Sequence, residues 1–211
     1  MIYKRFSAAI SVVFLLAIAT TAQQRAEVTV SLNEPFFDAL LDSMYQNFEA
    51  PQFPISNSGG SASCSETIKI LREGSGVRTA VRFREGKIYV PLAFSGNYAP
   101  PFVGCVDFAG WAETNIDLEF DRENQRLIGR AKVLNIHLNG SGGVGSGLIA
   151  KMLQSSIDKK LNPIEILRLD KLSFMVPVRD AGNLRLRATN LRPEIANGLL
   201  NVRVDFEFLK N

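Results

Sequence analysis

Histidine and cysteine are scarce in this chain of 211 residues, which contains one histidine, His137, and two cysteines, Cys64 and Cys105. No cluster of His, Cys, Asp and Glu has the spacing of metal ligands, so we expect neither a metal ion nor a cofactor. A Ser-His-Asp hydrolase has little support, because the single histidine lies in a strand-like run and the nucleophile motif G-x-S-x-G is absent. We therefore expect a protein that is not an enzyme.

A large excess of charge of one sign is also missing. The chain has 24 Lys and Arg against 21 Asp and Glu, a formal net charge of +3. This balance is not basic enough to predict binding to nucleic acid by bulk electrostatics.

Long apolar runs are missing after the first residues, where Lys4 and Arg5 precede the apolar stretch Phe6 to Ala19 and small residues end at Ala22. This order is typical of a secretory signal peptide, predicted here as residues 1–22. The alternative is an uncleaved membrane anchor, for which the apolar stretch is short against the ~20 residues of a spanning helix. We expect cleavage after Ala22, a single domain over 23–211 without a transmembrane span, and a periplasmic or secreted location.

The two cysteines have no C-x-x-C partner that would indicate metal or redox chemistry. Two cysteines in an exported chain predict one disulfide between Cys64 and Cys105, with two free thiols as the alternative.

The periodicity predicts an α+β protein. Alternating apolar residues predict a first strand at 28–32, and helical spacing follows from Phe36 to Phe48, with Asn33 as the N-cap. Residues 65–138 are mostly strand, with a hairpin turn at Glu85-Gly86, and a second amphipathic helix covers 148–161. Strands end the chain, placing Phe174 on a core face and a turn at Asn197-Gly198.

Between the strands and the second helix, Gly140, Gly142 and Gly145 match the dinucleotide fingerprint G-x-G-x-x-G. That fingerprint needs a βαβ unit, whereas the flanking strands alternate like those of antiparallel sheets. We interpret these glycines as a turn from strand to helix.

The order of elements resembles the tubular lipid-binding (TULIP) superfamily, which includes bactericidal/permeability-increasing-like proteins and small periplasmic bacterial relatives. The likeness lies in "FFDALLDSMYQNFEAPQFPI" and "VLNIHLNGSGGVGSGLIAKMLQSSIDKKLNPIEI", with the pattern L-x-x-x-I-x-x-x-L at Leu153, Ile157 and Leu161. The resemblance implies a long curved antiparallel sheet wrapped around two amphipathic helices. It also implies an apolar seam between helices and sheet that holds acyl chains.

The resemblance implies a non-enzymatic binder or carrier of a lipid or other acyl-chain ligand. The ligand-binding residues would be Phe37, Leu41, Met44, Phe48, Ile149, Met152, Leu153 and Ile157. If so, Met152→Trp should block lipid uptake and leave the protein folded, because a replaceable ligand gives way to added volume.

The alternative is a structural or protein-interaction envelope protein with a closed core. Pro91 within a strand indicates an edge or a bend, and the loop "YAPPFVGCVDFAGW" presents Phe102 and Trp111 beside prolines. Aromatic residues of this kind can form a recognition surface for an envelope protein partner.

Overall fold

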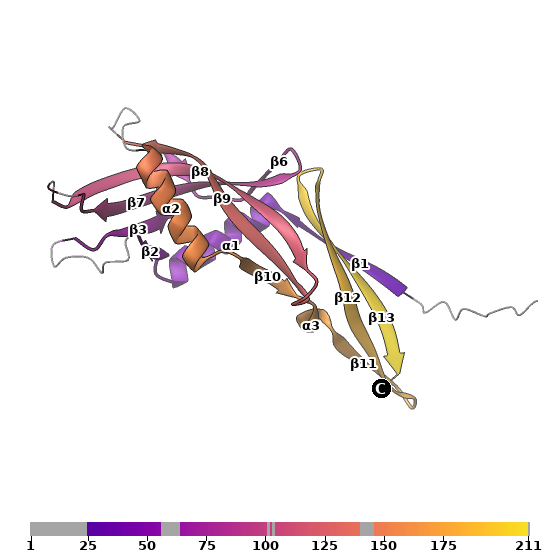
Figure 1. The fold of residues 1–211 in the computed structure, drawn as a ribbon. Helices are drawn as coiled ribbons and strands as arrows, with labels where there is room; N and C mark the ends of the chain where they lie inside the picture. The colour runs from indigo at the N-terminus through magenta and orange to yellow at the C-terminus, as the bar shows by residue number, and fades with distance from the viewer. Residues whose placement is uncertain (1–24, 56–63, 101, 103, 140–145, 211) are drawn as a thin grey trace, which may run out of the picture.

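The computed structural model describes residues 25–55, 64–100, 102, 104–139 and 146–210. The predicted signal peptide and the glycines at 140, 142 and 145 lie outside these residues and stay predictions. The described chain consists mostly of antiparallel strands with a few helices, an α+β protein as the sequence predicts (Figure 1).

The larger of two main sheets has seven strands, in the order β10-β9-β8-β7-β3-β2 with β6 added beside β7. Its strands are β2 (Gln52–Pro54), β3 (Thr67–Leu71), β6 (Arg82–Arg84), β7 (Lys87–Tyr98), β8 (Val106–Asp121), β9 (Arg126–Leu138) and β10 (Ile164–Arg168). The predicted hairpin turn joins β6 to β7, and its residues Glu85 and Gly86 both have positive φ, 50° and 71°. Two positive φ values are what a two-residue hairpin turn of type I′ requires.

Pro91 lies inside β7, where its missing N–H is tolerated by a gap in the sheet. Among the described residues, β6 pairs with β7 up to Tyr89, and β3 pairs with β7 from Ala93 onward. Pro91 lies in the gap between these two ladders while its other side pairs with Glu113 of β8. On that side no strand of the sheet pairs with Pro91, although its carbonyl accepts a hydrogen bond from the Ala80 N–H at 3.4 Å, and such positions tolerate a proline.

The smaller main sheet has the antiparallel order β1-β13-β12-β11, so the first strand of the described residues pairs with the last. Its strands are β1 (Arg25–Asn33), β11 (Phe174–Val178), β12 (Gly182–Ala196) and β13 (Leu199–Lys210). The predicted turn at Asn197-Gly198 joins β12 to β13, again with two positive φ values. The sequence predicts one long sheet, and the structure has two, at opposite ends of an elongated molecule (Figure 1). A short hairpin of β4 (Glu73–Gly74) and β5 (Val77–Arg78) is separate from both.

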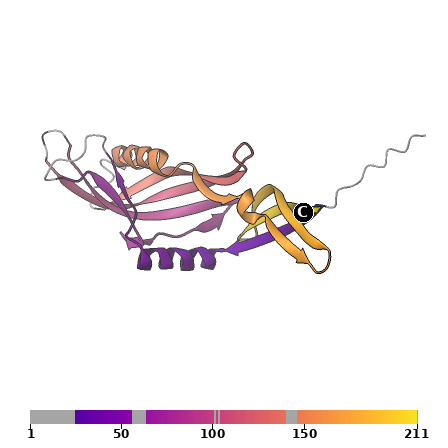
Figure 2. The ribbon, with the colours of Figure 1, turned by 90° about the horizontal axis from the view of Figure 1, so that it is seen from below.

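Two amphipathic helices run along the larger sheet. Helix α1 (Glu34–Asn47) starts at the predicted N-cap, where the Asn33 side chain accepts a hydrogen bond from the Phe36 N–H at 3.0 Å. Helix α2 (Ser146–Lys160) ends before Pro163, as predicted, and a single turn, α3 (Leu169–Leu172), follows β10. In Figure 2, α2 runs along the top of the molecule and α1 along the bottom, with strands of the larger sheet visible between them.

The buried side chains form two separate cores. One lies between α2 and the inner face of the larger sheet and includes Ile68, Phe94 and Leu153, each 0% exposed. The other lies against the smaller sheet and α3, around Leu191 and Val204. Space between two cores is where a ligand site can form.

The placement of Phe174 in the core is wrong. Its side chain is 52% exposed, with only an edge contact to the Phe206 ring at 6.1 Å between centroids. Its strand, β11, is the outermost of the smaller sheet, and all five of its residues are exposed. The alternation that indicates one buried face holds only where another layer covers that face.

The predicted disulfide between Cys64 and Cys105 is confirmed, and it closes a loop of sequence separation 41. Disulfides persist in oxidising compartments. Within the described part of the chain, no helix is long and apolar enough to cross a membrane.

Candidate functional site

A cavity of about 310 Å³ lies between the C-terminal half of α1, the larger sheet and the end of α2. Only three of its fifteen lining residues have polar side chains, namely Tyr45, Thr79 and Glu49. The apolar lining residues are Leu41, Met44, Phe48, Pro51, Phe53, Ile70, Val81, Val90, Leu92, Ile116, Ile157 and Leu161. We call this space the first cavity.

A second cavity of about 430 Å³ lies between β1, the smaller sheet, β10 and the larger sheet. Every side chain that lines it is Val, Leu, Ile or Phe. The lining residues are Val30, Leu32, Phe37, Val81, Ile88, Ile116, Leu127, Ile164, Ile166, Leu167, Leu172, Leu200, Val202 and Val204. Both cavities have the size of small-molecule sites, roughly 300–1,000 Å³.

The two cavities are neighbours, because Val81 and Ile116 line both. We call the residues that line the two cavities the seam. The seam follows α1 and β1 from Phe48 back to Val30, and these two elements run in one line in Figure 2. At ~1.5 Å per helical residue and ~3.3 Å per strand residue, its length is about 30 Å.

Two of the three polar groups of the first cavity, Thr79 and Tyr45, form hydrogen bonds within the protein. The Thr79 hydroxyl donates to the Leu71 carbonyl at 2.6 Å and accepts from the Ala93 N–H at 2.9 Å. The Tyr45 hydroxyl donates to the Ile70 carbonyl at 3.3 Å, and burial raises the pKa of Tyr45. These groups leave methyl and ring surface facing the cavity, so the seam offers contact to hydrocarbon.

Helix α1 forms one wall of the seam without burying any of its own residues. Phe36, Leu40, Met44 and Phe48 recur every fourth residue along one ridge and are 48%, 46%, 42% and 72% exposed. Residues at this spacing are neighbours on a helix surface. The apolar side chains of α1 are therefore only partly covered by the rest of the protein.

Part of the seam is open to solvent. Five of the large hydrophobic residues that line it are exposed, and they come from β1, α1, the residues that follow α1 and α2, and β10: Val30, Met44, Phe48, Leu161 and Ile166. We call these five residues the mouth. A ligand in the seam can keep a polar group in water at the mouth.

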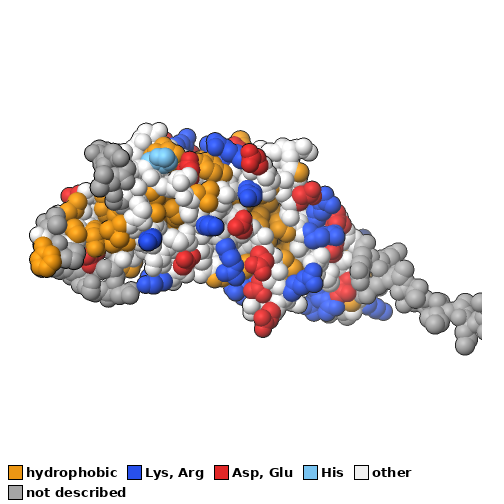
Figure 3. Space-filling model, turned by 45° about the horizontal axis from the view of Figure 1, so that its top comes forward, with side chains coloured by type: hydrophobic (Ala, Val, Ile, Leu, Met, Phe, Trp, Pro, Cys, Tyr) orange, Lys and Arg blue, Asp and Glu red, His pale blue; other side chains and the backbone are white. Residues whose placement is uncertain are grey.

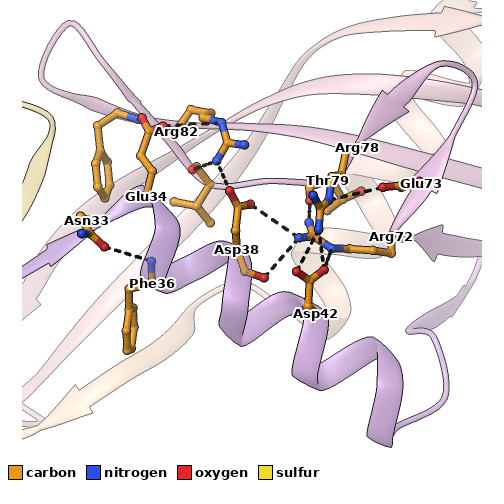
Figure 4. A network of polar contacts seen from close by, with 12 residues as sticks. Asn33, Glu34, Phe36, Asp38, Asp42, Arg72, Glu73, Arg78, Thr79 and Arg82 are labelled. Carbon is orange, nitrogen blue, oxygen red and sulfur yellow. Dashed lines mark hydrogen bonds and ion pairs between the residues drawn. The ribbon is translucent and has the colours of Figure 1, made fainter.

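Ion pairs hold α1 in place along its other side (Figure 4). Glu34, Asp38 and Asp42 recur every fourth residue and face arginines that lie in and around the short strands β4 to β6. Arg82 Nη1 donates to Asp38 Oδ2 at 3.0 Å, and Arg72 Nε donates to Asp42 Oδ1 at 2.7 Å. We call these contacts, with those of Arg78, the Arg–Asp clamp.

Asp42 is the most heavily bonded carboxylate of the clamp. Arg78 Nη2 donates to its two oxygens at 2.7 and 2.9 Å, in addition to the bond from Arg72. Hydrogen bonds from Arg72 and then Arg78 lower the pKa of the Asp42 carboxyl below 3.8. The same bond to Asp42 raises the pKa of Arg78. Both groups are thus stabilised in their charged forms.

Helix α2 is fixed differently, by side chains on it and just after it that bond to the backbone of β9 and β2. Gln154 Oε1 accepts from the Val133 N–H at 2.7 Å, and Asn162 Oδ1 accepts from the Ala131 N–H at 2.8 Å. The Ser156 hydroxyl donates to the Pro54 carbonyl at 2.9 Å. These bonds and the buried side chains of α2 make it part of the core, whereas α1 covers a hollow.

The structure separates the eight predicted ligand-binding residues into two groups. Five line the seam: Phe37, Leu41, Met44, Phe48 and Ile157. Three lie outside both cavities, in the core between α2 and the sheet: Ile149, Met152 and Leu153. Helix α1 and the end of α2 therefore line the seam, whereas the first half of α2 does not.

Sequence analysis missed the seam residues that lie on strands, such as Val30, Ile116 and Ile166. Their alternation with polar residues marks one face of each strand. It does not show whether a helix, another sheet or an open space faces them.

Phe102 and Trp111, named for a recognition surface, lie outside the seam. The Phe102 side chain is fully exposed, whereas the Trp111 ring stacks on the His137 ring at 4.1 Å between centroids. Among the described residues, no three His, Cys, Asp or Glu side chains form a group that could hold a metal ion. On the face in Figure 3, Lys and Arg side chains are interspersed with Asp and Glu.

The sequence matches no protein-family model, and its comparison with curated proteins gives no match.

Proposed function

We propose that this protein is a non-enzymatic binder or carrier of a lipid whose hydrocarbon lies in the seam. The observation that carries this proposal is the second cavity, whose fourteen lining residues are all apolar and which shares Val81 and Ile116 with the first cavity. Binding energy would come from burial of apolar surface, about 25 cal/mol per Å² removed from water. In this proposal the curved antiparallel strands wrap around the two helices, and the ligand fills the space beneath α1.

The openness of the seam supports a ligand over a closed core. Contiguous exposed apolar patches are unusual in monomeric proteins and mark interaction or ligand sites. Here the exposed residues of the mouth line cavities whose other lining side chains are apolar, apart from Glu49, Tyr45 and Thr79 in the first cavity. Water in such a space finds few hydrogen-bond partners, so hydrocarbon is the favoured occupant.

We propose a periplasmic or secreted location for this function. The disulfide between Cys64 and Cys105 requires an oxidising compartment to persist. The features of residues 1–22 that predict a signal peptide agree with that compartment.

Paired variants on β1 test the proposal. Val28 and Val30 point to the same face of the strand and are 50% and 48% exposed, but only Val30 lines a cavity. Val30→Asp should weaken uptake of a fluorescent fatty acid at least tenfold, because a carboxylate is costly to bring into contact with apolar surroundings. Val28→Asp is the matched control and should bind as the wild type does.

Native mass spectrometry of protein purified from its own compartment should show a bound lipid. A ligand-free spectrum, together with no uptake of fatty acid or phospholipid by the wild type, contradicts the proposal. Equal loss of uptake in both variants would point to damage of the smaller sheet, and a seam ligand would then lack support.

Protein interaction is a second candidate function, favoured by two exposed features at opposite ends of the molecule. Phe102 is fully exposed, and all five residues of the edge strand β11 are exposed. A pull-down with Phe102→Ala and with Met175→Ser tests this candidate. Loss of a captured envelope protein supports it, and an unchanged set of captured proteins contradicts it.

A further inference from the structure

We infer that the end of the smaller sheet docks on the surface of a bilayer that contains anionic lipid. This inference goes beyond the proposed function, because it concerns an outer surface of the protein and does not depend on what the seam holds. The surface lies on the β11–β12 hairpin and the neighbouring part of β13, at one end of the molecule (Figure 1).

One face of the smaller sheet is apolar as far as the end of its strands. The register places Phe174, Leu186 and Phe208 side by side on β11, β12 and β13. Val176 and Leu184 form the next row on the same face, because side chains two residues apart point to the same side of a strand. We call the six apolar residues of these rows and the hairpin end the end face: Phe174, Val176, Val178, Leu184, Leu186 and Phe208.

No other part of the described chain covers the end face. Phe174 is 52% exposed, Val178 is 44% exposed, and Val176 and Phe208 are each 36% exposed. One row farther into the sheet, Phe206 is buried. The apolar face therefore leaves the core and continues into solvent, and contiguous apolar patches of this kind mark interaction sites.

The edge of the sheet is also apolar, on both of its faces. All five residues of β11 are exposed, and none of them has a polar side chain. Natural proteins protect exposed edge strands with charged residues or with proline, and β11 has Pro177. Because proline hinders pairing with a further strand, we expect the partner to contact the side chains of β11 and not its backbone.

Positive charge surrounds the end face. Arg179 follows Val178 in the hairpin turn, and its side chain is 97% exposed. Lys210 pairs with Leu184, so its exposed side chain lies beside the end face. Residues 168–187 contain five Lys and Arg against two Asp, an excess of three that equals the net charge of the whole chain. An apolar face with cations at its rim is complementary to an anionic bilayer, which takes up apolar side chains and attracts basic ones.

A second copy of the chain fits the end face less well than a bilayer does. At ~200 Å² for a whole Phe, the exposed fractions of Phe174 and Phe208 amount to about 180 Å². The other four residues are smaller and less than half exposed, so the end face offers less than about 600 Å² by the same measure. A standard protein interface takes about 800 Å² from each partner. Two end faces would also bring like charges together, at Arg179 and Lys210.

Co-sedimentation of the exported protein with vesicles tests the inference. One set of vesicles contains phosphatidylcholine alone, and the other contains equal parts of phosphatidylcholine and phosphatidylglycerol. The wild type should bind the anionic vesicles more strongly by about tenfold or more, because each basic residue near the surface adds to the attraction. Added salt should weaken this preference, since it screens exposed charges.

Two aspartate variants separate the end face from the rest of the surface. Val178→Asp places a carboxylate on the end face, and Val106→Asp on β8 is the matched control, with exposed fractions of 44% and 41%. Val178→Asp should weaken vesicle binding by about tenfold or more, because a charge is costly to bring into apolar surroundings. Val106→Asp should bind as the wild type does. Uptake of a fluorescent fatty acid should be equal in both variants, since neither residue lines a cavity.

Two glutamate variants test the contribution of charge. Arg179→Glu and Lys132→Glu change the net charge equally, and both side chains are exposed, but Lys132 lies on β9 of the larger sheet. Arg179→Glu should weaken binding to anionic vesicles and leave binding to phosphatidylcholine unchanged. Lys132→Glu should have the smaller effect. Because Arg179 is almost fully exposed, this test does not depend on a residue of the core.

The outcomes separate a bilayer from other partners. A wild type that binds neither set of vesicles overturns the inference, as does equal binding by the wild type and Val178→Asp. Equal loss in Val178→Asp and Val106→Asp also overturns it. A wild type that is a dimer by light scattering, becomes a monomer with Val178→Asp and ignores vesicles would assign the end face to a second copy. Fatty-acid uptake is measured separately, so a wild type that takes up none contradicts the proposed function and leaves the docking test intact.

Discussion

Arg72 joins two successive turns of α1 through one guanidinium group. Its Nε donates to Asp42 Oδ1 at 2.7 Å, and its Nη2 donates to the backbone carbonyl of Asp38 at 3.2 Å. The Arg72 side chain is 13% exposed, so water competes little for these bonds. Because α1 buries none of its own residues, its position over the seam depends on such polar contacts.

Replacing Arg72 with methionine should therefore destabilise the protein. We expect a loss of about 2–3 kcal/mol in the free energy of unfolding, since hydrogen bonds to charged groups contribute about 1.5–3 kcal/mol. Arg130→Met is the matched control, because Arg130 pairs with Glu119 at 3.5 Å where both side chains are more than half exposed. Exposed pairs contribute about 0–1 kcal/mol. Urea unfolding of both variants measures the difference, and equal losses would show that α1 is held by other contacts.

The Arg–Asp clamp should also respond to acid. Hydrogen bonds from Arg72 and Arg78 lower the pKa of Asp42 in the folded protein below 3.8. A lowered pKa stabilises the folded state above pH 3.8, and this contribution disappears as the pH falls toward the folded-state pKa. Asp42→Asn should consequently lower the Tm at pH 7, and its Tm should approach that of the wild type below about pH 4.

The difference in Tm between wild type and Asp42→Asn removes the contribution of the other acidic groups, which are the same in both proteins. Asp121 is one of them, with a pKa lowered to about 2 by the side chain and N–H of Asn124 and by Arg126, and it is present in both proteins. Thermal unfolding from pH 2.5 to 8 provides the test. A Tm difference that stays constant over this range would show that Asp42 does not titrate with folding.

Met152 should behave as a core residue. It packs beside Leu153 against the larger sheet and lines neither cavity. The expectation that Met152→Trp leaves the protein folded assumed a replaceable ligand beside Met152, and the structure has packed protein there. Extra volume in a packed core costs about 1–3 kcal/mol. Met44→Trp, at a mouth position, should cost less, and thermal unfolding of the two variants checks the order.

The disulfide should contribute measurably to stability. Its loop of sequence separation 41 gives about 4 kcal/mol in the chain-entropy model. The variant with Cys64→Ala and Cys105→Ala should lose stability of that order in urea unfolding. Thiol titration of the unfolded, unreduced wild type should find no free thiol, and two reactive thiols would contradict the pairing in the exported protein.

The features that the sequence predicts well are local. The turn at Asn197-Gly198 needs two residues that tolerate positive φ, and the start of α1 needs the Asn33 side chain three residues before an N–H. These requirements are met by residues close together in the sequence, so the residue types alone indicate the structure. Pro91 is similar, because a missing N–H excludes a fully paired position.

The features that the sequence does not predict depend on which helix or sheet covers a given face of a strand or helix. Phe174 and Phe206 each belong to a series of apolar residues two positions apart, with Val176 and with Val204, yet Phe174 is half-exposed and Phe206 is buried. β11 lies at the edge of its sheet, whereas β13 lies between two strands. The same limit explains Leu153 and Met44, which have equivalent helical patterns but face a packed sheet and an open seam.

The pairing of β1 with β13 has a consequence for how the chain folds. The Ser31 hydroxyl donates to Asn201 Oδ1 at 2.6 Å across 170 residues of sequence. Contacts between such distant segments slow folding, because the loop that they close must lose its entropy before the contacts form. During synthesis, β1 emerges long before β13 and has no partner until Leu199–Lys210 has been made. The smaller sheet is therefore completed last, and a chain cut before Leu199 leaves its first strand without a partner.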